Sequence, residues 1–166
     1  MRYMKLDDAG RQELLSVLEA MPHFLRNTFA ALSTGQATLR GPDGSFSPVE
    51  QVWHLADLER EGFGMRIDRL LREANPYLQD FDGAGIAAAR NYRALSIDEG
   101  LKEFSAARRE NLRKLREIPD EAWARRGTQD GVGAVALCDI PSMIEQHDAA
   151  HREEIRKWRE HAAAGA

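Results

Sequence analysis

Two histidines near the carboxyl end of the sequence have the spacing of a metal-binding pair. His147 and His151 lie four residues apart. Side chains at this spacing project from the same face of a helix, one turn from each other, so both imidazoles can converge on one ion. They interrupt an inward stripe that otherwise contains Ile144, Ile155 and Trp158. A pair of buried imidazoles needs hydrogen-bond partners and resists protonation, and a bound metal ion would remove that difficulty.

His54 is the candidate for a third ligand. It follows Trp53 in an amphipathic segment that should pack in the same bundle as the helix of His147 and His151. Three neutral histidines from two helices would bind a divalent ion and leave positions open for water or substrate, as catalytic metal sites do. The residues alone leave a second interpretation open. The pattern His-x-x-x-His is common on helices, and His54 could be an ordinary packed histidine.

The spacing excludes a metalloprotease of the zincin type. That motif requires His-Glu-x-x-His, whereas the residue after His147 is Asp148, which is one methylene shorter. The longer form of the motif requires a third histidine six residues beyond the second. His161 lies ten residues beyond His151, so this form does not fit either.

Three charged residues could assist the histidines. Glu50 lies one turn before His54 and Asp57 lies three residues after it, so either carboxylate could orient an imidazole or accept a proton from bound water. Arg108 lies on or beside the inner face of its predicted helix and could contact a carboxylate of the substrate. The simpler interpretation is a solvated position for both carboxylates. For the arginine it is a side chain that lies along the apolar surface with its charge in water.

Hydrophobic periodicity predicts the helices that must position these residues. Apolar residues recur at steps of three and four over residues 14–32, 49–74, 96–118 and 139–161. A serine followed three residues later by glutamate marks the start of two of these helices, at Ser47 and Ser96. Pro22 predicts a kink or a break in the first helix. Residues 33–46, rich in glycine, serine and threonine, predict a loop.

The connections contain no convincing set of strands. Residues 120–139 form a long connection before the last helix, in which Gly131–Leu137 could be a short strand or a buried loop. No internal repeat and no linker divides the sequence. We therefore expect one all-α domain over residues 1–166 that folds as a four-helix bundle.

Composition restricts the class of protein. The 166 residues include 23 basic and 27 acidic side chains, and this net charge of −4 disfavours a nucleic-acid binder. Cys138 is the single cysteine, so neither an internal disulfide nor a thiolate-rich metal cluster can form. Residues 1–8 lack an apolar leader, and no run is long enough to cross a membrane. We expect a cytoplasmic protein that acts on a small molecule and that can pair as a homodimer along an exposed apolar strip.

Together these features resemble the DinB superfamily. The motif Ser-Pro-x-Glu-x-x-x-His-Leu over residues 47–55, then a bundle, then His-Asp-x-x-His over residues 147–151 is similar to the DinB/YfiT-like metalloenzymes across nearly the whole chain. The resemblance implies a four-helix bundle of up-down-down-up type with a long connection before the last helix. It also implies a site for nickel, zinc or a similar divalent ion, with His54, His147 and His151 as its ligands.

Two reactions and one non-catalytic role remain open. An ion held by three histidines can lower the pKa of bound water to roughly 7 and give a metal-bound hydroxide for hydrolysis. The same open position can hold a thiol, which becomes a nucleophilic thiolate. The resemblance favours the thiol, because several DinB-like families use bacillithiol, mycothiol or glutathione to modify small electrophiles or to isomerise a substrate. It therefore implies a thiol S-transferase. A metal-dependent hydrolase and a non-catalytic metal-binding stress-response module are the alternatives.

Overall fold

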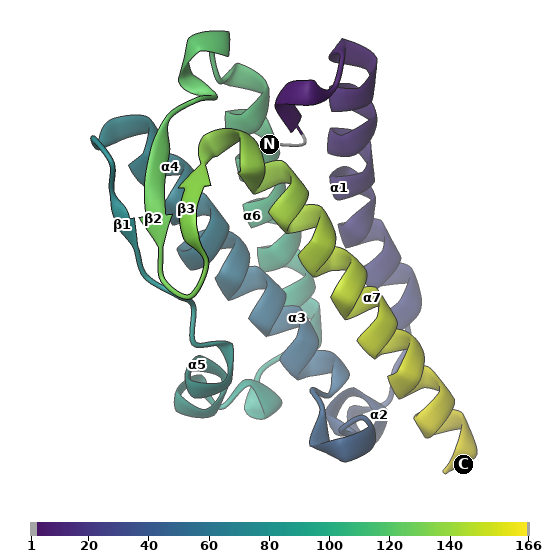
Figure 1. Cartoon of the computed structure of the whole chain (residues 1–166). Coiled ribbons are helices and arrows are strands. Elements are labelled where there is room, and N and C mark those ends of the chain that lie inside the picture. Colours follow the sequence, from purple (N-terminus) through teal and green to yellow (C-terminus); the bar gives the residue numbers. More distant parts are fainter. Residues whose placement is uncertain (1–2, 166) are drawn as a thin grey trace.

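Four long helical segments run beside one another in the computed structural model, which describes residues 3–165 (Figure 1). The segments are α1 (Asp8–Phe29), α3 (Pro48–Asp57) continued by the π-helical turn η3 (Leu58–Gly64) and α4 (Met65–Arg72), α6 (Ile97–Glu117), and α7 (Ile140–Ala164). In Figure 1, α1 and α7 run downward, whereas α3–α4 and α6 run upward. The predicted four-helix bundle is confirmed. Residues 1, 2 and 166 of the predicted domain lie outside the described part of the chain.

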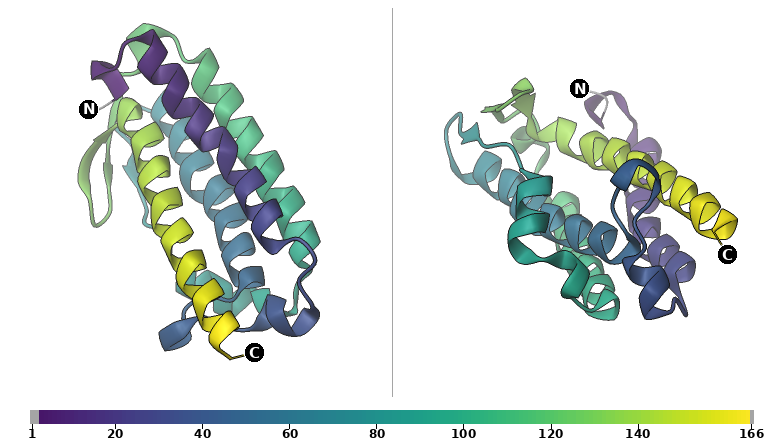
Figure 2. Two further views of the ribbon diagram at one scale, coloured as in Figure 1. Left: turned by 90° about the vertical axis from the view of Figure 1, so that its right-hand side faces the viewer. Right: turned by 90° about the horizontal axis from the view of Figure 1, so that it is seen from below.

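The second and third segments run in the same direction because the connection between them returns to the lower end of the molecule. Figure 1 shows α5 (Gly83–Arg90) at this end, just before α6 begins. The short helix α2 (Thr34–Thr38) lies at the same end, inside the stretch 33–46 that was predicted as a loop. Figure 2 shows from two further sides that these connections gather at one end of the bundle.

The predicted helix starts are present in the structure. The backbone N–H and the hydroxyl of Ser47 donate to the Glu50 carboxylate at 2.9 and 2.7 Å. The Ser96 hydroxyl accepts the Glu99 backbone N–H at 3.3 Å. The predicted break at Pro22 does not occur, because α1 continues through this residue to Phe29. Pro22 removes one helical hydrogen bond, but Met21 and Leu25 on either side of it remain fully buried in the bundle.

The expectation that the chain lacks a set of strands is wrong. Strands β1 (Tyr77–Leu78), β2 (Arg126–Gln129) and β3 (Gly133–Ala136) form a small sheet in that order, with β1 parallel to β2 and β2 antiparallel to β3. Strands of two to four residues are too short for periodicity to detect. The turn between β2 and β3 uses Gly131 and Gly133 at φ of 70° and 94°, a region that glycine enters without steric cost.

The core consists of two apolar clusters. One includes Leu14, Leu18, Phe63, Leu112 and Ile144, and the other includes Met21, Leu25, Val52, Phe104 and Ile155. Each long helical segment contributes to both clusters. Buried polar residues lie near the boundary of the two sets along each of the last three segments, and they include His54, Glu59, Arg108, Asp148 and His151. Burial of such groups is unfavourable unless they are paired, so this polar layer is where a function is to be sought. No helix of residues 3–165 combines the length and the apolar character needed to cross a membrane.

Candidate metal centre

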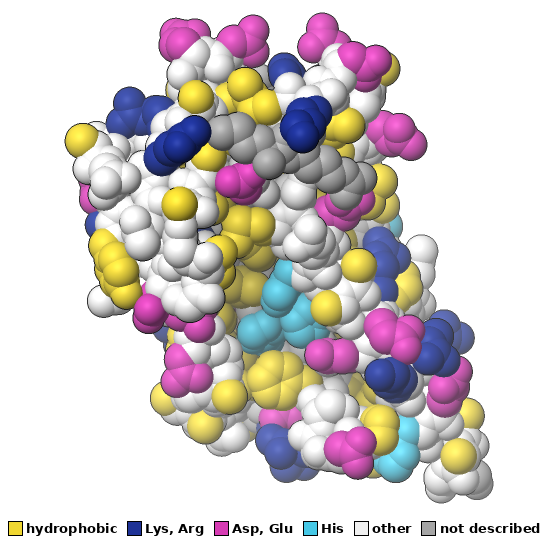
Figure 3. Space-filling view, in the orientation of Figure 1, with side chains coloured by type: hydrophobic (Ala, Val, Ile, Leu, Met, Phe, Trp, Pro, Cys, Tyr) yellow, Lys and Arg dark blue, Asp and Glu magenta, His cyan; other side chains and the backbone are white. Residues whose placement is uncertain are grey.

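The three histidines singled out in the sequence come together in the polar layer. His54 belongs to α3, and His147 and His151 belong to successive turns of α7. One nitrogen from each ring lies within 4.8 Å of those from the other two, and the Nε2 atoms of His147 and His151 are 3.1 Å apart. In Figure 3, histidine side chains gather in a hollow at the centre of one face, bordered by hydrophobic side chains. The site is therefore buried but open on one side.

Burial keeps two of these imidazoles uncharged. Loss of solvent, together with the nearby His151, lowers the pKa of His54 to about 4 and that of His147 to about 2. A neutral imidazole keeps the lone pair that a metal ion requires. The Nδ1 atom of His54 is buried and has no hydrogen-bond partner among the described residues. Three converging imidazoles, two of them held neutral by burial, fit a divalent transition metal.

Two residues that the sequence predictions missed, Gln51 and Glu154, hold the His151 ring. Gln51 Oε1 lies 2.5 Å from His151 Nδ1, and Gln51 Nε2 donates to Glu154 Oε2 at 2.7 Å. The pKa of Glu154 is lowered to about 2, first by its interaction with His151, so its carboxylate is ionised and can only accept. The amide nitrogen of Gln51 must then face Glu154 and its oxygen must face His151.

This arrangement determines the tautomer of His151. Because its Nδ1 donates to Gln51, the lone pair of its Nε2 faces the Nε2 of His147. Helical spacing could have indicated both partners, since Gln51 lies three residues before His54 and Glu154 lies three residues after His151. Partners of this kind orient metal-binding histidines and raise their basicity.

Glu50 and Asp57 are not solvated, which corrects the simpler interpretation of both. Glu50 is 3% exposed, and burial would raise its pKa, but hydrogen bonds from Ser47 and Arg40 outweigh burial and lower it. Asp57 is 1% exposed and accepts from the Tyr92 hydroxyl at 2.5 Å and from two arginines at 2.5 and 2.6 Å. Both carboxylates thus accept their hydrogen bonds from residues other than the histidines.

Arg108 does not lie along the surface with its charge in water. It is 1% exposed, and its guanidinium donates to both oxygens of Glu59 and both oxygens of Asp148 at 2.7–3.0 Å. A further bond reaches the Leu18 carbonyl at 2.8 Å. Two bidentate carboxylates compensate the loss of hydration, which explains how a charge can lie in the core. With its donors occupied, Arg108 links α6 to η3 and α7, and it offers none of them to a substrate.

Aromatic rings and one glycine form the walls beside the histidines. Ring centroids of Phe46 and Phe81 lie 5.4 and 5.9 Å from that of His54, and Phe63 lies 5.9 Å from His147. Gly83, at the start of α5, approaches His54 so closely that a Cβ atom there would lie 2.5 Å from its Cε1. A side chain at this position would therefore collide with the imidazole. These walls make the approach to the histidines apolar.

A four-helix bundle with three converging histidines defines a class of helical proteins with a candidate metal centre. The family model described as the DinB superfamily matches residues 9–155, so the chain belongs to the DinB superfamily. The resemblance inferred from the motifs is thereby confirmed. No curated protein sequence matches the chain significantly.

Two solved structures share the fold. YfiT from Bacillus subtilis, described as a "probable metal-dependent hydrolase with an unusual four-helix bundle topology", is 17% identical with a TM-score of 0.86, and the match covers 96% of this chain and 91% of YfiT. The mycothiol-dependent maleylpyruvate isomerase is 10% identical with a TM-score of 0.70. That match covers 87% of this chain but only 60% of the isomerase. At these identities the likeness shows the fold alone.

Proposed function

We propose that this protein is a divalent-metal-dependent enzyme in which His54, His147 and His151 hold one nickel, zinc or similar ion. The observation that carries the proposal is the convergence of three imidazole nitrogens within 4.8 Å, with two Nε2 atoms 3.1 Å apart. The lone pair of His151 Nε2 faces its neighbour instead of a proton donor from the solvent. A cation between these nitrogens would take the lone pair of one nitrogen from each ring.

For the reaction we propose S-transfer from a low-molecular-weight thiol to a small electrophile. A divalent ion at this site would lower the pKa of a thiol, which would lose its proton to water and be available as a thiolate. As the carbon–sulfur bond forms, the bond from that carbon to its leaving group breaks, and the leaving group departs with the electron pair, as chloride does from chlorodinitrobenzene. Such a reaction needs no carboxylate base. This suits the site, because Glu154, Glu50 and Asp57 are engaged with Gln51, Arg40 and Tyr92 respectively.

The residues of this chain supply orientation and exclude water. Gln51 and Glu154 hold the His151 ring in one tautomer. Phe46, Phe63 and Phe81 line the approach to the histidines with apolar surface, which suits an electrophile of low polarity. The isomerase that shares the fold is described as mycothiol-dependent, which is consistent with a thiol cosubstrate in a bundle of this kind.

Hydrolysis is the second candidate, because YfiT, which shares the fold over nearly its whole length, is described as a probable metal-dependent hydrolase. Two assays separate the reactions. A transferase consumes free thiol in the presence of glutathione and chlorodinitrobenzene, whereas a hydrolase cleaves an activated ester without added thiol. The variant H151A should lose whichever activity is present, and its retention would identify a contaminant.

Elemental analysis of the protein purified without a histidine tag tests the metal site. We expect about one equivalent of a divalent transition metal per chain, lost in the double variant H54A/H147A. The double variant H23A/H161A is the matched control, since both of its histidines are exposed and lie outside the cluster. Absence of metal after reconstitution would refute the site and make these histidines packing residues. Metal without either activity would favour a non-catalytic metal-binding stress-response module, whose thermal stability should still rise with metal.

A further inference from the structure

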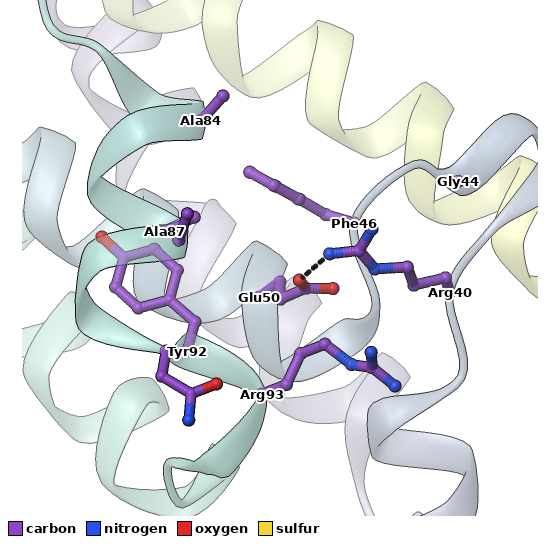
Figure 4. A pocket seen from close by; sticks show the side chains of 10 residues that line it. Arg40, Gly44, Phe46, Glu50, Ala84, Ala87, Tyr92 and Arg93 are labelled. Atoms are coloured by element: carbon purple, nitrogen blue, oxygen red, sulfur yellow. Dashed lines mark hydrogen bonds and ion pairs between the residues drawn. The ribbon is translucent and has the colours of Figure 1, made fainter.

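A second feature of the molecule is a cavity of about 450 Å³ between α5 and the segment that leads into α3. Its size falls within the range of small-molecule sites. Figure 4 shows Phe46 projecting toward Ala84 and Ala87, with Glu50 in the depth of the pocket and Arg40 and Arg93 at one edge. The cavity thus has an apolar part and a cationic edge.

A single aromatic ring, that of Phe46, lies between the cavity and the His54 ring. Phe46 lines it, and the same ring lies 5.4 Å from the His54 ring. Glu50 in its depth is one helical turn before His54 on α3. Ala84 on its opposite wall directly follows Gly83, whose backbone packs against His54. A ligand in the cavity that extends past Phe46 would therefore reach the candidate metal centre.

The charges of the cavity leave one cation uncompensated. Arg40 donates to Glu50 at 2.7 Å, and Glu50 is otherwise bonded to Ser47, so these two charges cancel. Arg93 is exposed, and its guanidinium donates only to the Thr38 carbonyl at 3.3 Å. Arg93 forms no ion pair among residues 3–165. The lining therefore has a net positive charge.

The turn that carries Arg93 has a defined shape. Asn91 ends α5 in the left-handed region at φ 48°, and its side chain lines the cavity. Tyr92, the next residue, is buried and donates to Asp57, which anchors the turn to α3. Arg93 is therefore presented at the rim by a fixed backbone, although its own side chain is exposed.

We propose that this cavity binds the carboxylate-bearing part of a small anionic ligand, with Arg93 as its cationic partner. The other end of the ligand extends past Phe46 to the histidines. What this other end of the ligand is chemically rests on the proposed function. It is either the thiol cosubstrate or the electrophile, and both can carry the carboxylate that the cavity recognises. A guanidinium suits this role because its planar donors match the two oxygens of a carboxylate.

Isothermal titration calorimetry of the protein as purified tests this assignment. One probe is S-methylglutathione, which has the carboxylates of an anionic thiol but no free sulfhydryl. The other probe is 4-chloro-3-nitrobenzoate, a carboxylate-bearing electrophile. Each is compared with its methyl ester, which for S-methylglutathione is the dimethyl ester, so that no carboxylate remains. We expect one of the acids to bind at least tenfold more tightly than its ester, and we expect this difference to shrink at high salt. The acid that binds identifies the source of the carboxylate.

The variant R93Q should weaken binding of that acid by about tenfold and leave binding of its ester unchanged. R72Q removes the same charge from an exposed arginine at the far end of α4 and should change nothing. The proposal would be overturned if neither acid bound, or if both acids bound no more tightly than their esters. It would also be overturned if R93Q and R72Q had equal effects. The titration reads heat of binding and needs neither metal nor turnover. It therefore remains informative if the proposed enzymatic activity fails.

Discussion

The amide of Gln51 decides which nitrogen of His151 carries the proton. Its oxygen lies 2.5 Å from Nδ1, and its nitrogen is committed to Glu154 at 2.7 Å. Without this amide the imidazole could rotate or change tautomer, and Nε2 would no longer present its lone pair toward His147. The residue that completes the candidate centre is thus a neutral amide and not one of the carboxylates beside His54.

The variant Q51L should weaken metal binding by about 10–100-fold, because it leaves the His151 ring without its acceptor. Competition with a chromophoric chelator measures the affinity, and thermal unfolding shows whether the variant is folded. Q12L replaces an exposed glutamine of α1 by the same residue and should bind metal like the wild type. A folded Q51L protein with unchanged affinity would contradict this role.

At the scale of elements, the polar layer fastens three helical segments through one arginine. Arg108 of α6 joins Glu59 of η3 and Asp148 of α7, and Asp148 directly follows His147. Glu59 stands in a π-helical turn, where the backbone N–H of Met65 bonds to the carbonyl five residues earlier. Such turns are frequent at functional sites. The same network therefore sets the position of α7 against the segment that continues from His54.

The variant R108M should lower the free energy of unfolding by about 3–5 kcal/mol, because two buried carboxylates lose their common partner. Urea denaturation measures the change. The neighbouring Arg109 is exposed, and R109M should stay within about 0.5 kcal/mol of the wild type. Equal stabilities of the two variants would show that the buried network contributes nothing to the fold.

The packing of α6 on α3 depends on a glycine at their contact. A Cβ atom at Gly100 would lie 2.8 Å from Val52 Cγ1 and 2.9 Å from Trp53 Nε1. The variant G100A should therefore destabilise the protein by about 1–3 kcal/mol, although alanine is the better helix former. At Gly35 in α2 the nearest atom to an added Cβ is Ser33 Oγ at 4.0 Å, so G35A should stabilise by roughly 0.5–1 kcal/mol. Stability changes of the same sign in thermal unfolding would contradict this close contact.

At the scale of the whole molecule, the buried histidines couple folding to pH when no metal is bound. The pKa values of His54 and His147 in the folded protein are about 4 and about 2, below the 6.5 of an unfolded chain. At pH values between the pKa in the folded protein and the pKa of 6.5 in the unfolded chain, each histidine binds more protons in the unfolded state than in the folded state. The contribution of the two histidines to stability is therefore complete above pH 6.5 and is lost as the pH falls.

We expect the metal-free protein to lose stability progressively from pH 6.5 to pH 4.5, a window in which Glu154 beside His151, with a pKa of about 2, stays ionised. Urea denaturation at stepped pH measures the slope. The variant H54Q should flatten it, whereas H23Q, at an exposed position of α1, should not. A stability that rises on acidification through this window would contradict neutral, buried imidazoles.

The elements of the fold that depend on residues close to one another in the sequence could be predicted. The periodic apolar stripes and the serines at 47 and 96 predicted the four long segments, because caps and helix faces depend on neighbours a few residues away. Strands of two to four residues carry no such signal, and β1 pairs with β2 some fifty residues further along the chain, at Tyr77 and Thr128. For the same reason α2, a single short helix, was predicted as loop.

The sequence by itself determined that the chain forms a helical bundle and that His147 and His151 share one helix face, because a period of 3.6 residues is a property of the helix alone. The tertiary structure decided how each polar group is satisfied. His151 meets Gln51 across a separation of 100 residues, and Arg108 meets Glu59 and Asp148 across 49 and 40. Which buried charges pair is decided by how the helices pack against one another, since packing determines which complementary group comes within hydrogen-bond distance.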